Sequence, residues 1–97
     1  MNGIELVTRE REEQVLKHKF DVTHDLIYQN EELVKAALYL LTGEEEFYPK
    51  SWAYKYYEKF RRKLQNMDKR ETYTVAAALI IAEIDRINAQ EDIDKPF

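Results

Sequence analysis

The chain has 97 residues, of which 44% are hydrophobic and 35% charged, with only two Gly and two Pro. This length suffices for one domain with one core, and so few turn-forming residues favour helices over a β-rich fold. The absence of Cys excludes disulfides and thiolate metal sites. The longest apolar run, residues 75–82, is far shorter than the ~20 residues that cross a bilayer. Because the N-terminus also lacks signal-peptide features, we expect a cytoplasmic protein that does not interact with membranes.

Charge is unevenly distributed along the chain. The net charge is −4, but residues 50–70 contain eight basic and two acidic residues, which leaves −10 for the remainder. A pI near 5.2 argues against general nucleic-acid binding. The basic segment 50–70 instead predicts contact with a nucleotide or an acidic protein partner.

The first predicted element is an amphipathic helix over residues 4–18. Its inner face carries Ile4, Val7 and Val15. The same face also carries three polar side chains, Arg11, Gln14 and His18. They either form buried or rim hydrogen bonds, as core polar groups must, or line a pocket.

A second helix is predicted to start at an Asn30 cap with acids in its first turn, and to end at Gly43 in a left-handed cap. Residues 19–29 before it show no clear period, with Phe20 expected to plug the core and a polar cluster at residues 23–25. The apolar stripe of the second helix is Leu33, Ala36, Ala37, Leu40 and Leu41.

A third helix is predicted after the acidic loop 44–50, with Ser51 as its N-cap. Its apolar positions are Trp52, Ala53, Tyr56, Tyr57, Phe60, Leu64 and Met67. The aromatic side chains among them exceed what so small a core needs, which predicts a homodimer.

The last helix, predicted near residues 70–88, is apolar on all sides between Val75 and Ala82 and is therefore expected to be buried. Its predicted stripe is Tyr73, Ala76, Ala77, Ile80, Ile84 and Ile87. Glu83 lies in an apolar sector, so it should face inward with a partner from the first or second helix. The candidate partners are Gln14, His18, His24 and Lys35.

The predicted fold is all-α, a compact bundle of three to four helices around a buried Ala/Ile-rich C-terminal helix. Residues 1–90 form its single domain, and 91–97 a mobile tail.

Carboxylates on neighbouring helices leave a metal-dependent alternative open. All-helical nucleotide pyrophosphohydrolases hold Mg²⁺ with such groups, because a hard cation needs several converging oxygens. The candidate ligands here are Glu10, Asp25, Glu32 and Glu83. Glu83 and Asp85, however, are two residues apart, and that motif needs three.

The order of several short motifs resembles a family of small, functionally uncharacterised helical proteins of phages and prophages. The shared positions are Glu10 and Gln14; Phe20 and His24-Asp25; Asn30, Glu32, Leu33, Ala36 and Ala37; and Ala82, Glu83, Ile84 and Arg86. The family often has a second Asp and a second His where this chain has Leu26 and Tyr28. Some members occur beside domains similar to dATP/dGTP diphosphohydrolases, which implies a nucleotide-related setting.

Two functions follow as expectations, and whether the protein is an enzyme stays open. The first is a non-catalytic helical module that binds a nucleotide or a protein partner without a cofactor. The second is a nucleotide phosphohydrolase-like enzyme, intact or degenerate, that uses Mg²⁺. In either case the site is predicted where the His24-Asp25 loop meets Gln14, Glu32 and Glu83. His24 and Asp25 are the catalytic candidates, and the ligand-binding candidates are Gln14, Lys35 and Arg86.

Overall fold

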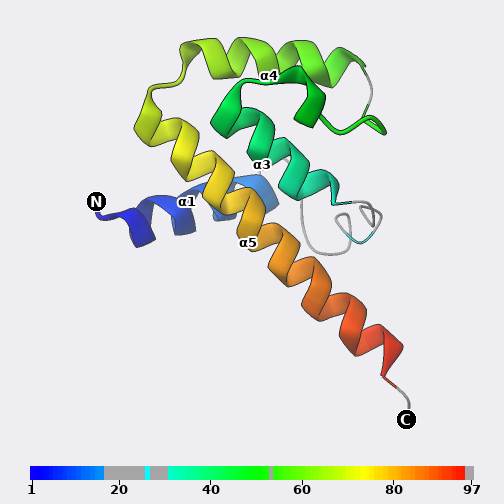
Figure 1. The fold of residues 1–97 in the computed structure, drawn as a ribbon. Helices are drawn as coiled ribbons and strands as arrows, with labels where there is room; N and C mark the ends of the chain where they lie inside the picture. The colour runs from blue at the N-terminus through cyan, green and yellow to red at the C-terminus, as the bar shows by residue number, and fades with distance from the viewer. Residues whose placement is uncertain (17–25, 27–30, 53, 96–97) are drawn as a thin grey trace.

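The computed structural model describes residues 1–16, 26, 31–52 and 54–95. In these residues the fold is all-α, as predicted, and contains no strand (Figure 1). The elements are α1 (Gly3–Leu16), α3 (Glu32–Thr42), the 3₁₀ turn η1 (Glu45–Phe47), α4 (Tyr54–Asn66) and α5 (Lys69–Asp94). No helix of the described part is long and apolar enough to cross a membrane.

The core lies where α3 and α1 pack against α5 (Figure 1). Its buried members are Leu33, Ala36, Ala37, Leu40, Val75, Ala76, Leu79 and Ala82. Four half-buried side chains cover this cluster: Trp52, Phe60, Leu64 and Met67. Half of the buried members are alanines, whose small side chains allow the helix backbones to approach closely. The predicted stripe of the second helix is confirmed except for Leu41, which is exposed.

Backbone geometry at the helix ends agrees in part with the sequence. Gly43 adopts φ 71° and its N–H donates to the Tyr39 carbonyl, which confirms the left-handed cap. The predicted Asn30 cap is wrong: α3 begins at Glu32, and its N-cap position is Glu31, at φ 61° and without a side-chain cap hydrogen bond. At the other end of the chain, α5 begins after Asp68, whose Oδ1 accepts a hydrogen bond from the Glu71 N–H at 2.8 Å.

Other predicted helix boundaries are wrong or lie outside the described residues. Helix α1 is described as far as Leu16, and its predicted end at residue 18 falls outside the described part of the chain. Helix α4 begins at Tyr54, so Ser51 in the preceding turn is not its N-cap. Helix α5 continues to Asp94, well beyond its predicted end at Asn88. Its C-terminal half extends away from the other described helices (Figure 1). The mobility of residues 91–97 stays a prediction.

The expectation that α5 is buried on all sides is also wrong. Tyr73, Ile80, Ile81, Ile84 and Ile87 are 38–54% exposed, while the opposite side of the helix is buried. The physical reason is that α1 and α3 both pack on that opposite side, which carries the alanines and Leu79. We call these five exposed side chains the α5 outer face.

Candidate functional site

Three of the polar residues assigned to the predicted site face the interior. Gln14, Glu32 and Glu83 are 5%, 4% and 5% exposed, so the inward orientation of Glu83 is confirmed. Among the other candidates, Lys35 is exposed and Glu10 is half-buried. The loop that was expected to complete the site, with His24 and Asp25, lies outside the described residues, as do His18 and Phe20.

Glu83 forms an ion pair within its own helix. The Arg86 Nε donates to Glu83 Oε1 at 2.6 Å, and the second guanidinium nitrogen lies 2.5 Å from the same oxygen. Neither Gln14 nor Lys35, the two described candidates for a partner from another helix, bonds to Glu83, and the other two candidates, His18 and His24, lie outside the described residues. The partner that the structure shows is Arg86, which lies one turn further along α5 and reaches back to the carboxylate. Glu83 Oε2 has no hydrogen-bond partner in the described part of the chain.

Other polar contacts lie within α1 and between α1 and α5. Gln14 Nε2 donates a long hydrogen bond of 3.5 Å to Glu10 Oε1, and Gln14 Oε1 has no partner among the residues described. The Arg11 Nε lies 3.8 Å from an Asp85 carboxylate oxygen, which links α1 to α5. Gln14 Oε1 and Glu83 Oε2 are thus two buried acceptors without a hydrogen bond in the described part of the chain, whereas the Asp85 side chain is 48% exposed.

The described residues do not assemble the metal site of the alternative function. Within residues 1–16, 26, 31–52 and 54–95, no three His, Asp or Glu side chains converge as a hard cation requires. Glu10, Glu32 and Glu83 belong to this part of the chain, whereas Asp25 does not. The structure therefore does not describe the positions of all four predicted metal ligands.

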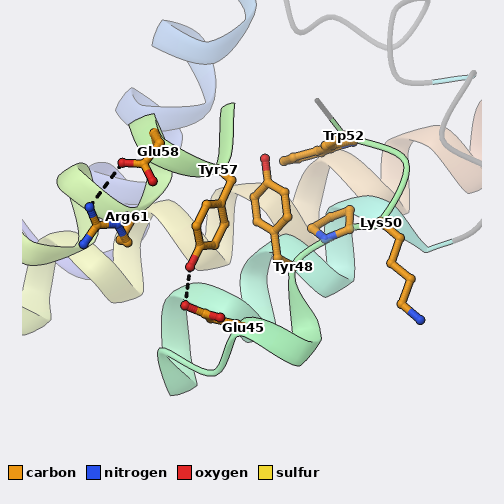
Figure 2. Close-up of a pocket in the computed structure, with 8 residues that line it drawn as sticks. Glu45, Tyr48, Lys50, Trp52, Tyr57, Glu58 and Arg61 are labelled. Carbon is orange, nitrogen blue, oxygen red and sulfur yellow. Dashed lines mark hydrogen bonds and ion pairs between the residues drawn. The ribbon is translucent and has the colours of Figure 1, made fainter. Parts of the chain in front are cut away.

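A different feature, an open pocket of about 660 Å³, lies between η1, the following turn and the start of α4 (Figure 2). Its lining residues are Glu45, Tyr48, Pro49, Lys50, Trp52, Tyr57, Glu58 and Arg61. The Tyr48 ring packs edge-to-face on Tyr57 and Trp52, with centroid separations of 5.2 and 5.9 Å. Because neighbouring rings already touch, no space for a base remains between them, and a planar ligand would have to stack on their outer surface.

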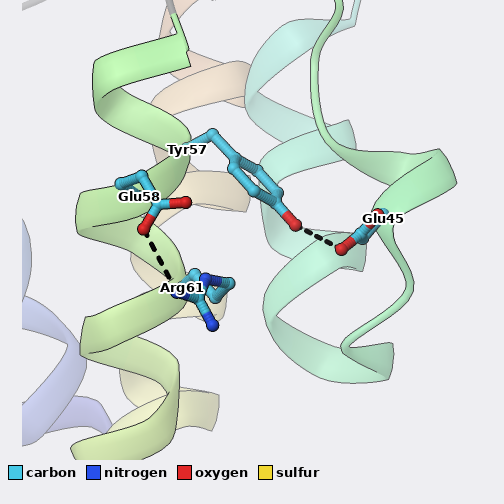
Figure 3. A network of polar contacts seen from close by, with 4 residues as sticks. All are labelled: Glu45, Tyr57, Glu58 and Arg61. Atoms are coloured by element: carbon cyan, nitrogen blue, oxygen red, sulfur yellow. Dashed lines mark hydrogen bonds and ion pairs between the residues drawn. The ribbon is translucent and has the colours of Figure 1, made fainter.

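The charges around this pocket form short-range pairs (Figure 3). The Tyr57 hydroxyl donates to a Glu45 carboxylate oxygen. That hydrogen bond, together with desolvation and the Glu45 charge, raises the pKa of Tyr57 to about 12. Arg61 lies 3.1 Å from Glu58, and this contact raises the pKa of Arg61. Glu45 and Glu58 therefore offset the positive charge of Arg61 and Lys50.

The sequence favoured the core or a dimer surface for the aromatic residues here and left base stacking by the aromatic and basic segment 48–63 as the weaker alternative, but it did not identify a pocket. Trp52 and Phe60 do pack against the core, which leaves less aromatic surface for self-association than predicted. The signal that was available is the acidic segment 44–46 immediately before an aromatic and basic helix. Opposite charges in adjacent segments favour folding of one against the other.

The α5 outer face is the third candidate. Its exposed side chains recur along one side of the helix at spacings of three and four residues, opposite the buried side. Isolated exposed apolar side chains are ordinary, but a contiguous row of them indicates a contact surface. Ile93 of the same helix is also exposed but, at 100° per residue, lies on the opposite side and is not part of this row.

No protein-family model matches the sequence, and neither curated proteins nor solved structures gave a match.

Proposed function

We propose that the protein is a non-catalytic helical module that binds a protein partner through the α5 outer face. The observation that carries this proposal is the row Tyr73, Ile80, Ile81, Ile84 and Ile87, each at least 38% exposed. Helix-in-groove and helix-pair contacts use anchors spaced in this way, at i, i+3 or i+4, and i+7. Large apolar side chains of this kind gain most when a partner removes them from water.

Packing on the other side of α5 supports the same reading. Val75, Leu79 and the alanines already anchor α5 to α1 and α3. The isoleucines of the outer face therefore add little to the packing of this core. Exposed Ile lowers solubility without stabilising the fold, so a partner that covers it accounts for its presence.

The proposal is tested by placing a photo-crosslinking amino acid at one position at a time in cells that produce the protein. A crosslinker at Ile84 should capture a protein, whereas the same group at Ile93 should not. Ile93 is a matched control because it is an exposed isoleucine (63%) of the same helix on the opposite side. Absence of any crosslink at Ile84, or equal capture at both positions, would refute the proposed function.

Nucleotide binding is a second candidate, favoured by the pocket in which Tyr48, Trp52 and Tyr57 lie near Lys50 and Arg61. A base could stack on the outer ring surface while the cations contact phosphate. Calorimetric titration with ATP and dATP tests this idea. Binding should be lost in Arg61→Ala and kept in Arg62→Ala, which removes an exposed neighbouring cation outside the pocket.

Membership of the phage and prophage family and a cytoplasmic location are also part of the proposal, supported by the motif order and composition of the sequence. The phosphohydrolase-like alternative depends on His24 and Asp25. It predicts that Mg²⁺ shifts the amide resonances of Glu10, Glu32 and Glu83. An unchanged amide spectrum at millimolar Mg²⁺ would count against it.

A further inference from the structure

The geometry points to a second copy of this chain as the partner, docked along α5 in the antiparallel direction. This inference rests on the proposed function, because it identifies what covers the same outer face. It places self-association on α5 and not on the aromatic residues of α4. Three features of the outer face support it. They are the charge at its two ends, the symmetry of its apolar row and the length of the face.

The apolar row has the spacing of a helix-pairing seam. Tyr73, Ala77, Ile80, Ile84 and Ile87 follow one another at alternating steps of four and three residues, the repeat that keeps side chains facing a neighbouring helix. The next positions of the same series are Arg70 before Tyr73 and Glu91 after Ile87. The seam therefore begins at a cation and ends at an anion.

Unpaired charge of opposite sign extends over both ends of α5. Lys69 and Arg70 lie at its start, and Glu91 and Asp94 near its end; all four are exposed. No ion pair joins any of them to another residue of the described chain, although the Asp94 carboxylate accepts a hydrogen bond of 3.0 Å from the Gln90 side chain. Each end of the seam thus has charge available for a partner.

These charges select one orientation of a helix pair. A parallel pair would place Lys69 and Arg70 beside the same cations of the partner, and the acids beside acids. An antiparallel pair places the basic end of each copy against the acidic end of the other, which is favourable at both ends. The two helix dipoles also oppose each other favourably in that orientation.

Two-fold symmetry fits the row as well. An isologous dimer needs a self-complementary patch. When the basic end of one helix meets the acidic end of the other, the axis passes near residues 80–82, in the middle of the row. The isoleucines then meet at the centre of the contact and the charges lie at its rim, which is the usual anatomy of an interface.

The length of the face sets the expected affinity. From Arg70 to Glu91 the helix spans roughly 30 Å, and a helix is about 10 Å wide. A contact of that size lies at the low end of specific interfaces. We therefore expect a reversible dimer with a dissociation constant on the order of micromolar.

Sedimentation equilibrium up to about 0.5 mM protein tests the inference. The wild type should change from monomer to dimer over this range. Ile84→Glu should weaken the dimer at least about tenfold, because it buries a charge at the centre of the contact, and Ile93→Glu should leave it unchanged. Circular dichroism establishes that both variants are folded.

Charge reversal tests the orientation. Lys69→Glu with Arg70→Glu should weaken an antiparallel dimer, because acids then face acids, but leave a parallel one unaffected. Adding Glu91→Lys and Asp94→Lys should restore the antiparallel dimer. All four changes suit the helix dipole, with acids at the N-terminal end and bases at the C-terminal end, so the helix itself is not weakened.

Cysteine crosslinking provides an independent readout, since the chain has no Cys of its own. A mixture of Arg70→Cys and Glu91→Cys chains should form a disulfide more readily than either variant alone. Preferential self-crosslinking of Arg70→Cys would overturn the antiparallel arrangement. A wild type that stays monomeric at the highest concentration would overturn the dimer. The proposed function would then survive only if the photo-crosslinking amino acid at position 84 captures a different protein. If Ile84→Glu leaves the dimer intact and the crosslinker at position 84 captures nothing, both proposals fail.

Discussion

Removing Arg86 should destabilise the fold far more than removing an exposed cation of the same helix. Arg86→Met leaves the Glu83 carboxylate, 5% exposed, without a hydrogen-bond partner among the residues described. Breaking a buried ion pair in this way costs about 3–5 kcal/mol, because an uncompensated charge remains. The Arg86 side chain is itself 12% exposed, so some water reaches the pair and we expect the lower end, about 3 kcal/mol. That is a large share of the 5–15 kcal/mol typical of a whole domain.

Urea denaturation followed by circular dichroism measures this loss. With a denaturant slope of roughly 1.5 kcal/mol per molar for a small domain, a loss of about 3 kcal/mol lowers the midpoint by about 2 M. The matched control is Lys95→Met, since Lys95, the C-cap residue of α5, pairs with Asp92 at the same i, i+3 spacing. That pair is 3.5 Å long, with both side chains 74% exposed, so its loss should not shift the midpoint measurably.

Removing both charges separates the ion pair from the burial of a single charge. Glu83→Leu combined with Arg86→Met should be within about 1 kcal/mol of the wild type or more stable, because well-packed apolar groups often replace a buried pair without loss. If Arg86→Met shifts the midpoint no more than Lys95→Met does, the reasoning is refuted. Glu83 would then draw its stabilisation from another group.

Three further predictions concern the core, the helix cap and the pocket. Leu79→Asp should unfold the protein by burying an unpaired carboxylate, whereas Ile80→Asp, on the exposed side, should stay folded; thermal melts that treat the two alike would contradict the assignment of the faces. Gly43→Ala should cost about 1 kcal/mol in urea denaturation. The cost comes from φ +71° and not from a clash, since a Cβ there meets only an ordinary contact; an unchanged midpoint would contradict this. The pKa of Tyr57 is raised to about 12, so the folded state favours the protonated hydroxyl. The stabilisation that its hydrogen bond to Glu45 provides is therefore complete below the unfolded pKa of about 10. It is lost as the pH rises to about 12. Burial also raises the pKa of Tyr39, so tyrosinate absorbance should show a late component that Tyr57→Phe reduces by one tyrosine and does not abolish, and titration of all tyrosines near pH 10 would count against it.

Local chemistry was sufficient to predict several features from the sequence. The helical class follows from the scarcity of Gly and Pro, and the cap at Gly43 follows from a glycine placed directly after a periodic apolar segment. The buried stripe of α3 and the inward orientation of Glu83 follow from counting positions around a helix. Each of these depends on residues close together in the chain.

Features that depend on other elements could not be predicted in the same way. Glu83 had several candidate partners outside its own helix, but the ion pair that the structure shows is with Arg86 of the same helix, which carries the charge that a buried carboxylate needs. The pocket arises because η1 and α4 bring Glu45 to Tyr57, twelve residues apart. A pattern within one helix contains no information about such pairings.

The two sides of α5 show how far contacts can be predicted from a helix sequence that is apolar all round. Such a sequence indicates contacts on both sides, but it does not say which of the contacts lie within the chain. Hydrophobicity alone would assign the isoleucines to the core, yet the buried side is the one with Ala76, Ala78 and Ala82. Small residues belong there because two neighbouring helices must approach closely, and large β-branched side chains would hold them apart. Ile80 and Ile84 lie on the other side of the helix and are 38% and 52% exposed. The dimer that we propose along α5 would supply the contact that the sequence indicates on that side.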